Sequence, residues 1–335
     1  MASAFYKTAY KKIPQYDFAL TPEENERIYK ELRGQRVTIK MERLPNNVNP
    51  KFQLSSSDIP TEVLTESYNI EYEYFRVPKH SGGFREIWAP NEELKTLQRL
   101  VMHILRDKKH ILEHNAAHGF VKGRNCKTAL QVHKANESNW FMKLDFHNFF
   151  PSWDIDTLTQ RLSYVYNLTE IPVGHIMDIA KLSSRNGYLV QGSPLSPYLT
   201  NIAMIAFDYE MTERCKKQGI IYTRYADDML FSSKERDKLE LYVINWVNQL
   251  INELELPIEL NESKTRLGSC AGRNWNLGIM YNREHKLTVG YRNKHLMKVI
   301  IHKKDELTLD ELLHWRGVLA YYKSIEPEYF ARFDL

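Results

Sequence analysis

The sequence has few cysteines, no long apolar run and no large excess of charge of either sign. Its cysteines, Cys126, Cys215 and Cys270, lie far apart and form no Cys-x-x-Cys pair, which argues against a disulfide framework or a structural zinc site. A reducing, cytoplasmic setting is therefore expected. No apolar stretch approaches the roughly 18–20 residues that cross a bilayer, and the first residues lack the apolar centre of a secretory signal, so no membrane partner is expected.

The composition that remains is that of an ordinary globular protein. The chain has 335 residues, 43% hydrophobic and 26% charged, which suffices for two or three packed subdomains. Because the net charge is only +4, the distribution of charge says more than its sum. Residues 286–304 contain no acidic residue and form a cationic strip: Lys286, Arg292, Lys294, Lys298, Lys303 and Lys304. Taken alone, such a strip is most often a solvated helix face.

Hydrophobic periodicity and turn residues predict a mixed chain with antiparallel hairpins in its middle and helices near its end. A Pro/Asn/Ser-rich loop is expected at 44–60. Strands are expected at 70–77, 85–88, 140–144, 220–225 and 229–232. Helices are expected to begin at Thr21 and Asn91, to cover about 154–165, 196–217 and 237–254, and to follow a capping box at Thr308–Glu311.

Two adjacent carboxylates, Asp227 and Asp228, lie at the tip of the second predicted hairpin, in the segment Tyr225-Ala-Asp-Asp228. Like charges this close repel each other, and a divalent cation would relieve the repulsion. Hard oxygen ligands suit Mg²⁺, which accepts one or two carboxylates together with substrate phosphates. Aspartates are also common in plain turns, so this pair alone is only suggestive.

A third acid, Asp145, follows the predicted strand 140–144 and could point into the same cleft. Three carboxylates would supply the ligands of a two-metal site, which clamps the attacking and leaving oxygens of an in-line displacement. The alternative is an ordinary helix N-cap or loop acid. A further segment, Gln191-Gly192, precedes Ser196-Pro197; its glycine permits close backbone approach, although a plain loop-to-helix start would look the same.

Taken in order, several short segments resemble the successive motifs of bacterial reverse transcriptases, most closely those of retrons and next those of other defence-associated, abortive-infection enzymes. The segments are RVPKHSGGFREIWAP (76–90), KLDFHNFFPS (143–152), QGSPLSP (191–197), YADD (225–228), NESKT (261–265) and NLGI (276–279). The resemblance covers about residues 70–282. It implies an α+β right-hand polymerase fold with an N-terminal extension and fingers at 1–138, a palm at 139–282 and a short helical thumb at 283–335.

The resemblance also implies roles for matching residues. Asp145, Asp227 and Asp228 would be the catalytic acids that bind two Mg²⁺ ions, with Mn²⁺ as a possible substitute. Phe150 would be the steric gate that favours deoxynucleotides. The deoxynucleotide would be bound by Lys79 and Arg85 of the fingers, Gln191 and Gly192 of the pocket, and Lys264 near the leaving pyrophosphate. Leu277 and Gly278 would form the primer grip, and Lys294, Lys298 and Lys303 would contact nucleic acid.

Simpler interpretations exist for some of these residues. Lys79 beside the Gly-Gly turn could be a solvated hairpin tip, and Arg85 could be a cross-strand ion-pair partner. His114 and His118 are spaced like a zinc pair, but no general-base glutamate lies between them and Gly119 follows, so a structural role is expected.

The implied function is an RNA-directed DNA polymerase that copies a structured, partner non-coding RNA into a DNA product. An antiphage role, with a toxin or effector protein encoded nearby, follows by analogy. The sequence departs from the retron pattern at residues 128–133, where Thr128 replaces Asn and one residue is added before His133, and at Asn276-Leu-Gly278, where retron enzymes have Val-Thr-Gly. The alternatives are a non-retron defence reverse transcriptase and a catalytically silent RNA-binding scaffold.

Overall fold

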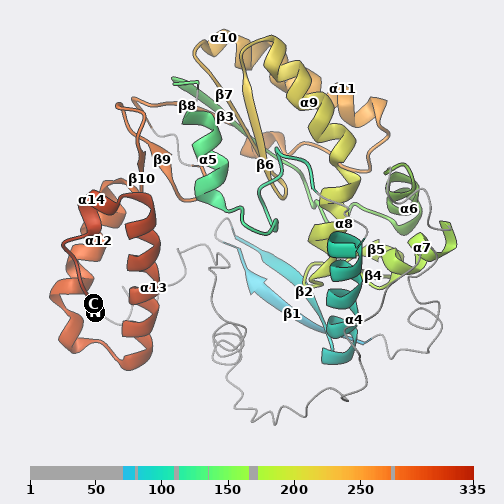
Figure 1. Cartoon of the computed structure of the whole chain (residues 1–335), viewed down its shortest axis with the longest axis horizontal. Helices are drawn as coiled ribbons and strands as arrows, with labels where there is room; N and C mark the ends of the chain where they lie inside the picture. The colour runs from blue at the N-terminus through green and yellow to red at the C-terminus, as the bar shows by residue number, and fades with distance from the viewer. Residues whose placement is uncertain (1–70, 80–81, 109–112, 135, 166–172, 273–275) are drawn as a thin grey trace. The chain divides into compact units, whose positions relative to one another are not determined.

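The computed structural model describes residues 71–79, 82–108, 113–134, 136–165, 173–272 and 276–335 (Figure 1). The helix expected from Thr21 and the loop expected at 44–60 lie outside these residues.

The described chain begins with a hairpin that is followed by a capped helix. Strands β1 (Tyr72–Pro78) and β2 (Phe84–Pro90) pair with each other, as predicted. Helix α4 (Glu92–His103) begins after Asn91, whose side chain accepts a hydrogen bond from the Leu94 N–H at 2.8 Å, and a π-helical turn, η1 (Ile104–Lys108), follows it. The hairpin tip, Pro78–Arg85, belongs to a different compact unit from the rest of the described chain.

A four-stranded antiparallel sheet forms the centre of the larger unit. Its strand order is β6 (Ile221–Tyr225), β7 (Asp228–Ser233), β3 (Trp140–Asp145) and β8 (Arg266–Ser269). Since successive side chains point to opposite faces of a strand, one face contributes Met142, Leu144, Met229 and Phe231 to the main hydrophobic core. The sheet lies between α5 (Cys126–Lys134) on one side and α9 (Ile205–Lys217) on the other (Figure 1).

Further helices and a small hairpin complete this core. Helix α6 (Ile155–Ser163) is capped by Asp154, close to the predicted start at 154. The sequence did not predict α5, α7 (Val173–Lys181) or the hairpin of β4 (Ser184–Arg185) and β5 (Tyr188–Leu189). Strands of two residues are too short to show an alternating pattern, which explains the missing hairpin.

Two long predicted helices are interrupted. The helix expected at 196–217 is divided into α8 (Leu195–Ala203) and α9, because the ψ angle of 1° at Met204 lies outside the helical range. The helix expected at 237–254 consists of α10 (Arg236–Lys238), the π turn η3 (Leu239–Val243) and α11 (Ile244–Glu253). A π turn adds a residue to the local turn, and periodicity alone does not reveal it.

The end of the chain is helical, as predicted. After the 3₁₀ turn η4 (Glu262–Lys264) and β8, a small hairpin forms from β9 (Met280–Tyr281) and β10 (Leu287–Thr288). The remaining elements are α12 (Gly290–His302), η5 (Lys304–Glu306), α13 (Leu309–Ile325) and α14 (Pro327–Phe330). The predicted capping box of Thr308 and Glu311 is confirmed at the start of α13. No helix of the described residues is both long and apolar enough to cross a membrane.

A buried histidine fastens α5 to the sheet. His133 is 1% exposed; its Nδ1 lies 2.7 Å from Ser232 Oγ and its Nε2 lies 2.8 Å from Thr223 Oγ1. Both ring nitrogens therefore have a hydroxyl partner on the sheet, one on β7 and one on β6. Burial lowers the pKa of His133 to about 3, and the nearby His118 adds to this effect.

This histidine should make the protein sensitive to mild acid. Its pKa is lower in the folded chain than in the unfolded chain, so its contribution to stability is complete above about pH 6.5 and is lost as the pH falls. Between pH 7.5 and pH 5 the loss should be about 2 kcal/mol in the free energy of unfolding. Denaturant titrations should show that His133→Gln reduces the loss between pH 7.5 and pH 5 by about 2 kcal/mol, whereas His295→Gln, at an exposed position, leaves the loss unchanged. An unchanged slope in His133→Gln would contradict the assignment.

Candidate active site

The structure brings Asp145, Asp227 and Asp228 to one end of the central sheet. Asp145 is the last residue of β3 and lies directly opposite Asp228, the first residue of β7. Asp227 lies in the two-residue turn between β6 and β7, and its carbonyl oxygen accepts a hydrogen bond from the Phe146 N–H at 3.2 Å. Asp145 is 5% exposed, and the other two are half-buried. Acids far apart in the sequence thus converge, as predicted.

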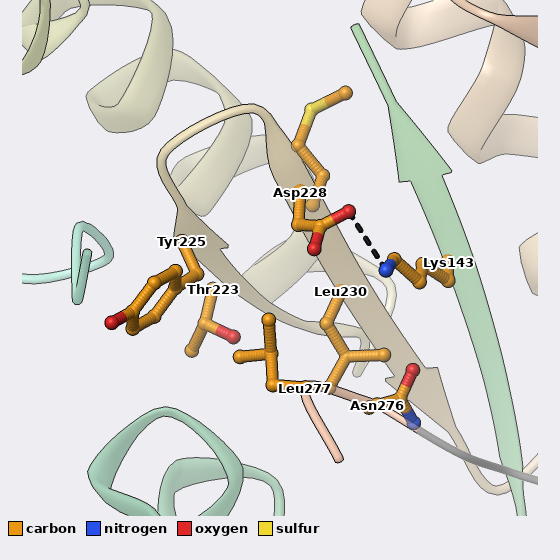
Figure 2. Close-up of a pocket in the computed structure, with 8 residues that line it drawn as sticks. Lys143, Thr223, Tyr225, Asp228, Leu230, Asn276 and Leu277 are labelled. Carbon is orange, nitrogen blue, oxygen red and sulfur yellow. Dashed lines mark ion pairs between the residues drawn. The ribbon is translucent and has the colours of Figure 1, made fainter. Parts of the chain in front are cut away.

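Two lysines form ion pairs with two of the three carboxylates. Lys143 Nζ lies 2.8 Å from Asp228 Oδ1, and Lys264 Nζ lies 2.7 Å from Asp145 Oδ2 (Figure 2 shows the first pair). Sequence reasoning missed Lys143. The sequence spacing could have indicated it, because Lys143 is two residues before Asp145 on the same strand and therefore lies on the same face of the sheet. The Lys264 side chain is half exposed, so it can move towards another anion.

Burial and charge repulsion shift Asp227 and Asp228 towards their neutral forms. Burial raises the pKa of Asp227 to about 6, and the negative charges of Asp228 and Asp145 contribute to the increase. Burial also raises the pKa of Asp228, against the opposing effect of Lys143. Carboxylates that repel one another in a half-buried cleft are the donors that a hard divalent cation would stabilise.

The donor chemistry therefore fits a metal site, although the side chains do not already form a cage. Within the described parts of the chain, no group of three His, Cys, Asp or Glu side chains is arranged to hold an ion. The three carboxylates do not converge on one point, because Asp145 and Asp228 each direct an oxygen at a lysine ammonium group. Metal binding would have to compete with these two ion pairs.

A tight turn lies beside the β6–β7 hairpin. Asn276 and Ile279 exchange both backbone hydrogen bonds, at 2.8 and 3.0 Å, and the residues between them, Leu277 and Gly278, both have positive φ. Asn276 and Leu277 line a small pocket together with Thr223 and Tyr225 of β6, Asp228, Met229 and Leu230 of β7, and Lys143 of β3. Figure 2 shows the turn next to these strands. Of the two predicted grip residues, Leu277 therefore lines the same pocket as the hairpin that carries Asp227 and Asp228.

Gln191 and Gly192 are held against β2. The Trp88 N–H donates to the Gln191 carbonyl at 2.7 Å, and Gly192 has a φ of +121°. A Cβ atom at Gly192 would lie 2.4 Å from the Trp88 carbonyl oxygen, so only glycine fits this contact. The guanidinium of Arg185 covers the Trp88 ring at 3.7 Å.

Comparison with known families agrees with this arrangement. Residues 77–292 match the family described as reverse transcriptase (RNA-dependent DNA polymerase). The chain belongs to the reverse transcriptase family. The retron Ec83 reverse transcriptase of Escherichia coli is 30% identical over 271 residues, which are 78% of this chain and 86% of the relative. The retron Mx65 reverse transcriptase of Myxococcus xanthus is 31% identical over 278 residues, 77% of this chain and 62% of the relative.

Among solved structures, the chain is similar to a telomerase from Candida albicans in complex with a fragment of telomeric RNA. The alignment covers 82% of this chain and 58% of the telomerase chain, with 13% sequence identity and a TM-score of 0.48. The family match confirms the predicted α+β right-hand polymerase fold and the retron-type resemblance. The reverse transcriptase is thus an RNA-directed DNA polymerase, and its departures at 128–133 and 276–278 do not alter its family.

The expected steric gate of the reverse transcriptase, Phe150, is partly buried at the edge of the main core. Its ring is 5.5 Å from that of Phe149, which is 3% exposed and stacks on Phe146 at the same distance. The two neighbouring phenylalanines therefore differ: Phe149 is a core residue, whereas Phe150 retains surface that a ligand can contact. Its role as the gate stays a prediction.

The fingers lysine and arginine lie in the separate unit at the hairpin tip. The backbone N–H of Lys79 donates to the Gly83 carbonyl at 3.0 Å, which closes the tip, and Arg85 is exposed on β2. Their predicted contact with a triphosphate therefore stays a prediction.

The three lysines predicted to contact nucleic acid, in the segment predicted as the thumb, have different surroundings. Lys294 Nζ lies 2.5 Å from Glu326 and 4.5 Å from the centre of the Tyr329 ring. Lys303 pairs with Glu306 at 3.1 Å. Lys298 is exposed, and its Nζ lies 6.0 Å from the centre of the Tyr329 ring. Of the three, Lys298 has the most accessible charge for a phosphate.

The histidine pair considered as a zinc site has a structural role. His118 Nδ1 lies 3.0 Å from Thr128 Oγ1, and the His118 backbone N–H donates to the Arg224 carbonyl at 2.7 Å. Burial lowers the pKa of His118 to about 4, with a further contribution from Arg124. His114 Nδ1 accepts from the Ala116 N–H at 3.2 Å. Both rings therefore support the loop that packs on the catalytic turn.

Proposed function

We propose that this reverse transcriptase copies a structured partner RNA into DNA by a two-metal mechanism at Asp145, Asp227 and Asp228. The observation that supports the proposal most strongly is the alignment of Asp145 with Asp228, next to Asp227 with its raised pKa. Two Mg²⁺ ions, or Mn²⁺ in their place, would stabilise charge on the attacking and leaving oxygens when bound there.

The chain's own residues would position the reactants. A terminal hydroxyl of the primer attacks the α-phosphate of a deoxynucleotide, and pyrophosphate leaves. The turn containing Leu277 and Gly278 would hold the primer end beside the acids, since it packs on the catalytic hairpin. The Lys264 ammonium, now on Asp145, would neutralise the leaving pyrophosphate. Gln191 and Gly192 would line the nucleotide pocket.

Primer extension tests this proposal. Purified protein with its own RNA should incorporate deoxynucleotides in Mg²⁺, and chelation should stop incorporation. A protein that binds the RNA but incorporates nothing in either Mg²⁺ or Mn²⁺ would instead be the silent scaffold.

The RNA partner should lie along α12. The exposed side chains of this helix include Lys298 and Tyr291, which is 83% exposed and stacks on the His295 ring at 6.1 Å. Cationic and aromatic side chains on one helix suit a nucleic acid, because they offer contacts to both phosphates and bases.

Removing one phosphate contact should weaken RNA binding in a salt-dependent way. Lys298→Ala should reduce affinity and lower the slope of log K against log[salt] by about 1. Lys294→Ala is the matched control, because Lys294 pairs with Glu326 within the thumb and should change the slope much less. Filter binding or fluorescence anisotropy at several salt concentrations measures both. Equal slopes for Lys298→Ala and the wild type would exclude Lys298 from the contact.

The biological setting rests on the resemblance alone. We propose that the protein acts in the cytoplasm and serves antiphage defence with an effector or toxin protein encoded nearby. The cytoplasmic setting is in keeping with Cys126, Cys215 and Cys270, which are buried and form no disulfide. A structured RNA gene immediately upstream would support the retron assignment of this role. Its absence would favour a non-retron defence enzyme.

A further inference from the structure

We propose that Arg224 is a positioning residue for the catalytic aspartates: its buried guanidinium holds the turn that carries Asp227 and Asp228 through a hydrogen bond to the Ala226 carbonyl. The inference rests on the proposed catalytic role of these aspartates.

Arg224 forms a fully buried ion pair beneath the turn. Its Nε and Nη2 atoms donate to the two carboxylate oxygens of Asp208 on α9, at 2.9 and 2.6 Å, and both side chains are 0% exposed. The Tyr222 hydroxyl donates to the same carboxylate at 2.8 Å. This bidentate geometry fixes the plane of the guanidinium group.

The remaining donors of the guanidinium are directed at the turn and at α8. Nη1 donates to the Ala226 carbonyl and to Asn201 Oδ1, both at 3.0 Å. Ala226 is the residue before Asp227, and its φ of 56° is a left-handed conformation that a non-glycine residue adopts only when its surroundings impose it. The hydrogen bond from Arg224 is one such constraint.

The backbone around Arg224 is constrained by a second element. The Arg224 N–H donates to the Ala116 carbonyl at 2.7 Å, and the Arg224 carbonyl accepts from the His118 N–H. In the same loop, a Cβ at Gly119 would lie 2.6 Å from the Ala226 nitrogen. The Asn201 amide then joins this loop to the network by donating to the Gly119 carbonyl at 2.9 Å.

Stability alone does not account for this network. A buried ion pair costs so much desolvation that well-packed apolar residues of similar volume often serve the fold equally well. A lysine could neutralise Asp208, but it lacks the planar fork that reaches Asp208, Asn201 and Ala226 together. What arginine adds is the fixed position of the turn. Because carboxylates must be held within a fraction of an ångström of their working geometry, this position should control catalysis.

The decisive variant removes the polar network but keeps the packing. This triple variant combines Arg224→Met, Asp208→Leu and Tyr222→Phe. It leaves no unpaired buried charge, and it also removes the Tyr222 hydroxyl, which would otherwise lose its acceptor on Asp208. The melting temperature should fall by only a few degrees, because the Ala226 carbonyl and Asn201 Oδ1 lose the donor that Arg224 supplied. The kcat for nucleotide incorporation should fall by about 30-fold or more, with the KM for deoxynucleotide and the RNA affinity within about threefold of wild type. The Mg²⁺ concentration for half-maximal activity should rise, since the acids are no longer held in place.

A second variant and a control keep the test decisive. Arg224→Lys retains the positive charge and should lower kcat by less than the triple variant does, at a wild-type melting temperature. If the triple variant does not fold, Arg224→Lys alone tests the positioning role of Arg224. The matched control replaces another largely buried pair, Arg106 and Glu113, 2.5 Å apart, by Met and Leu, and should leave kcat unchanged.

Two results separate this inference from the proposed function. If the wild type is active and Asp227→Asn is inactive, the catalytic assignment holds; a folded triple variant with wild-type kcat and Mg²⁺ dependence would then overturn the role of Arg224 alone. If the wild type is inactive, or Asp227→Asn is as active as the wild type, the catalytic assignment fails, and the positioning role fails with it.

Discussion

Asp227→Asn is expected to abolish DNA synthesis without weakening the fold. Loss of one metal-binding carboxylate removes several kcal/mol of transition-state stabilisation, so kcat should fall by on the order of 10³-fold or more. Burial and the neighbouring acids raise the pKa of Asp227 to about 6, so its charge is unfavourable in the folded chain. A neutral amide removes this repulsion, and the melting temperature in EDTA should be unchanged or higher.

Metal titration adds a second signature to the same variant. If the three acids bind Mg²⁺ in the folded chain only, Mg²⁺ should raise the melting temperature of the wild type, by the equivalent of about 2.7 kcal/mol at a concentration 100 times its Kd. Asp227→Asn should lose most of this increase. Asp178→Asn, which removes an acid that pairs with Lys181 on α7, is the control and should behave as the wild type. Substantial activity in Asp227→Asn would refute the catalytic assignment.

Phe150→Val is expected to relax sugar discrimination. If the Phe150 ring crowds the 2′-hydroxyl of a ribonucleotide, removing it should raise kcat/KM for ribonucleotides by about 100-fold relative to deoxynucleotides. Stability should change little, since Phe150 is only partly buried at the edge of the core. Single-nucleotide incorporation with matched dNTP and rNTP measures the ratio.

The adjacent phenylalanine provides the control. Phe149 is 3% exposed and stacks on Phe146, so Phe149→Val should lower the free energy of unfolding by about 2 kcal/mol through the cavity that it leaves. It should not change the ratio of rNTP to dNTP incorporation. The gate would lie elsewhere if Phe150→Val left this ratio unchanged, or if both variants changed it equally.

The sequence predicts the parts of the site that depend on local patterns. Apolar strands that end in acids place Asp145 at the end of β3 and Asp227 and Asp228 at the β6–β7 turn, and the two-residue turn fixes the register. Asn91 and Thr308 predict helix starts because capping depends on residues three positions apart.

Long-range partners are not predictable in this way. Arg224 lies two residues after Tyr222, on the same core-facing side of β6. A charged residue at such a position indicates a buried partner. Nothing local identifies that partner as Asp208 on α9. The lysine contacts that now engage Asp228 and Asp145 also depend on how β7 and η4, respectively, lie beside β3. The break at Met204 has no proline or glycine to announce it.

The most direct test of the central claim is anomalous diffraction at the manganese edge from crystals grown with a primer–template and a non-hydrolysable deoxynucleotide. We expect two Mn²⁺ peaks roughly 3.5–4 Å apart, bounded by the carboxylates of Asp145, Asp227 and Asp228, with Lys143 and Lys264 displaced from their present partners. Manganese peaks only at other positions, with these three acids still bound to their lysines, would contradict it.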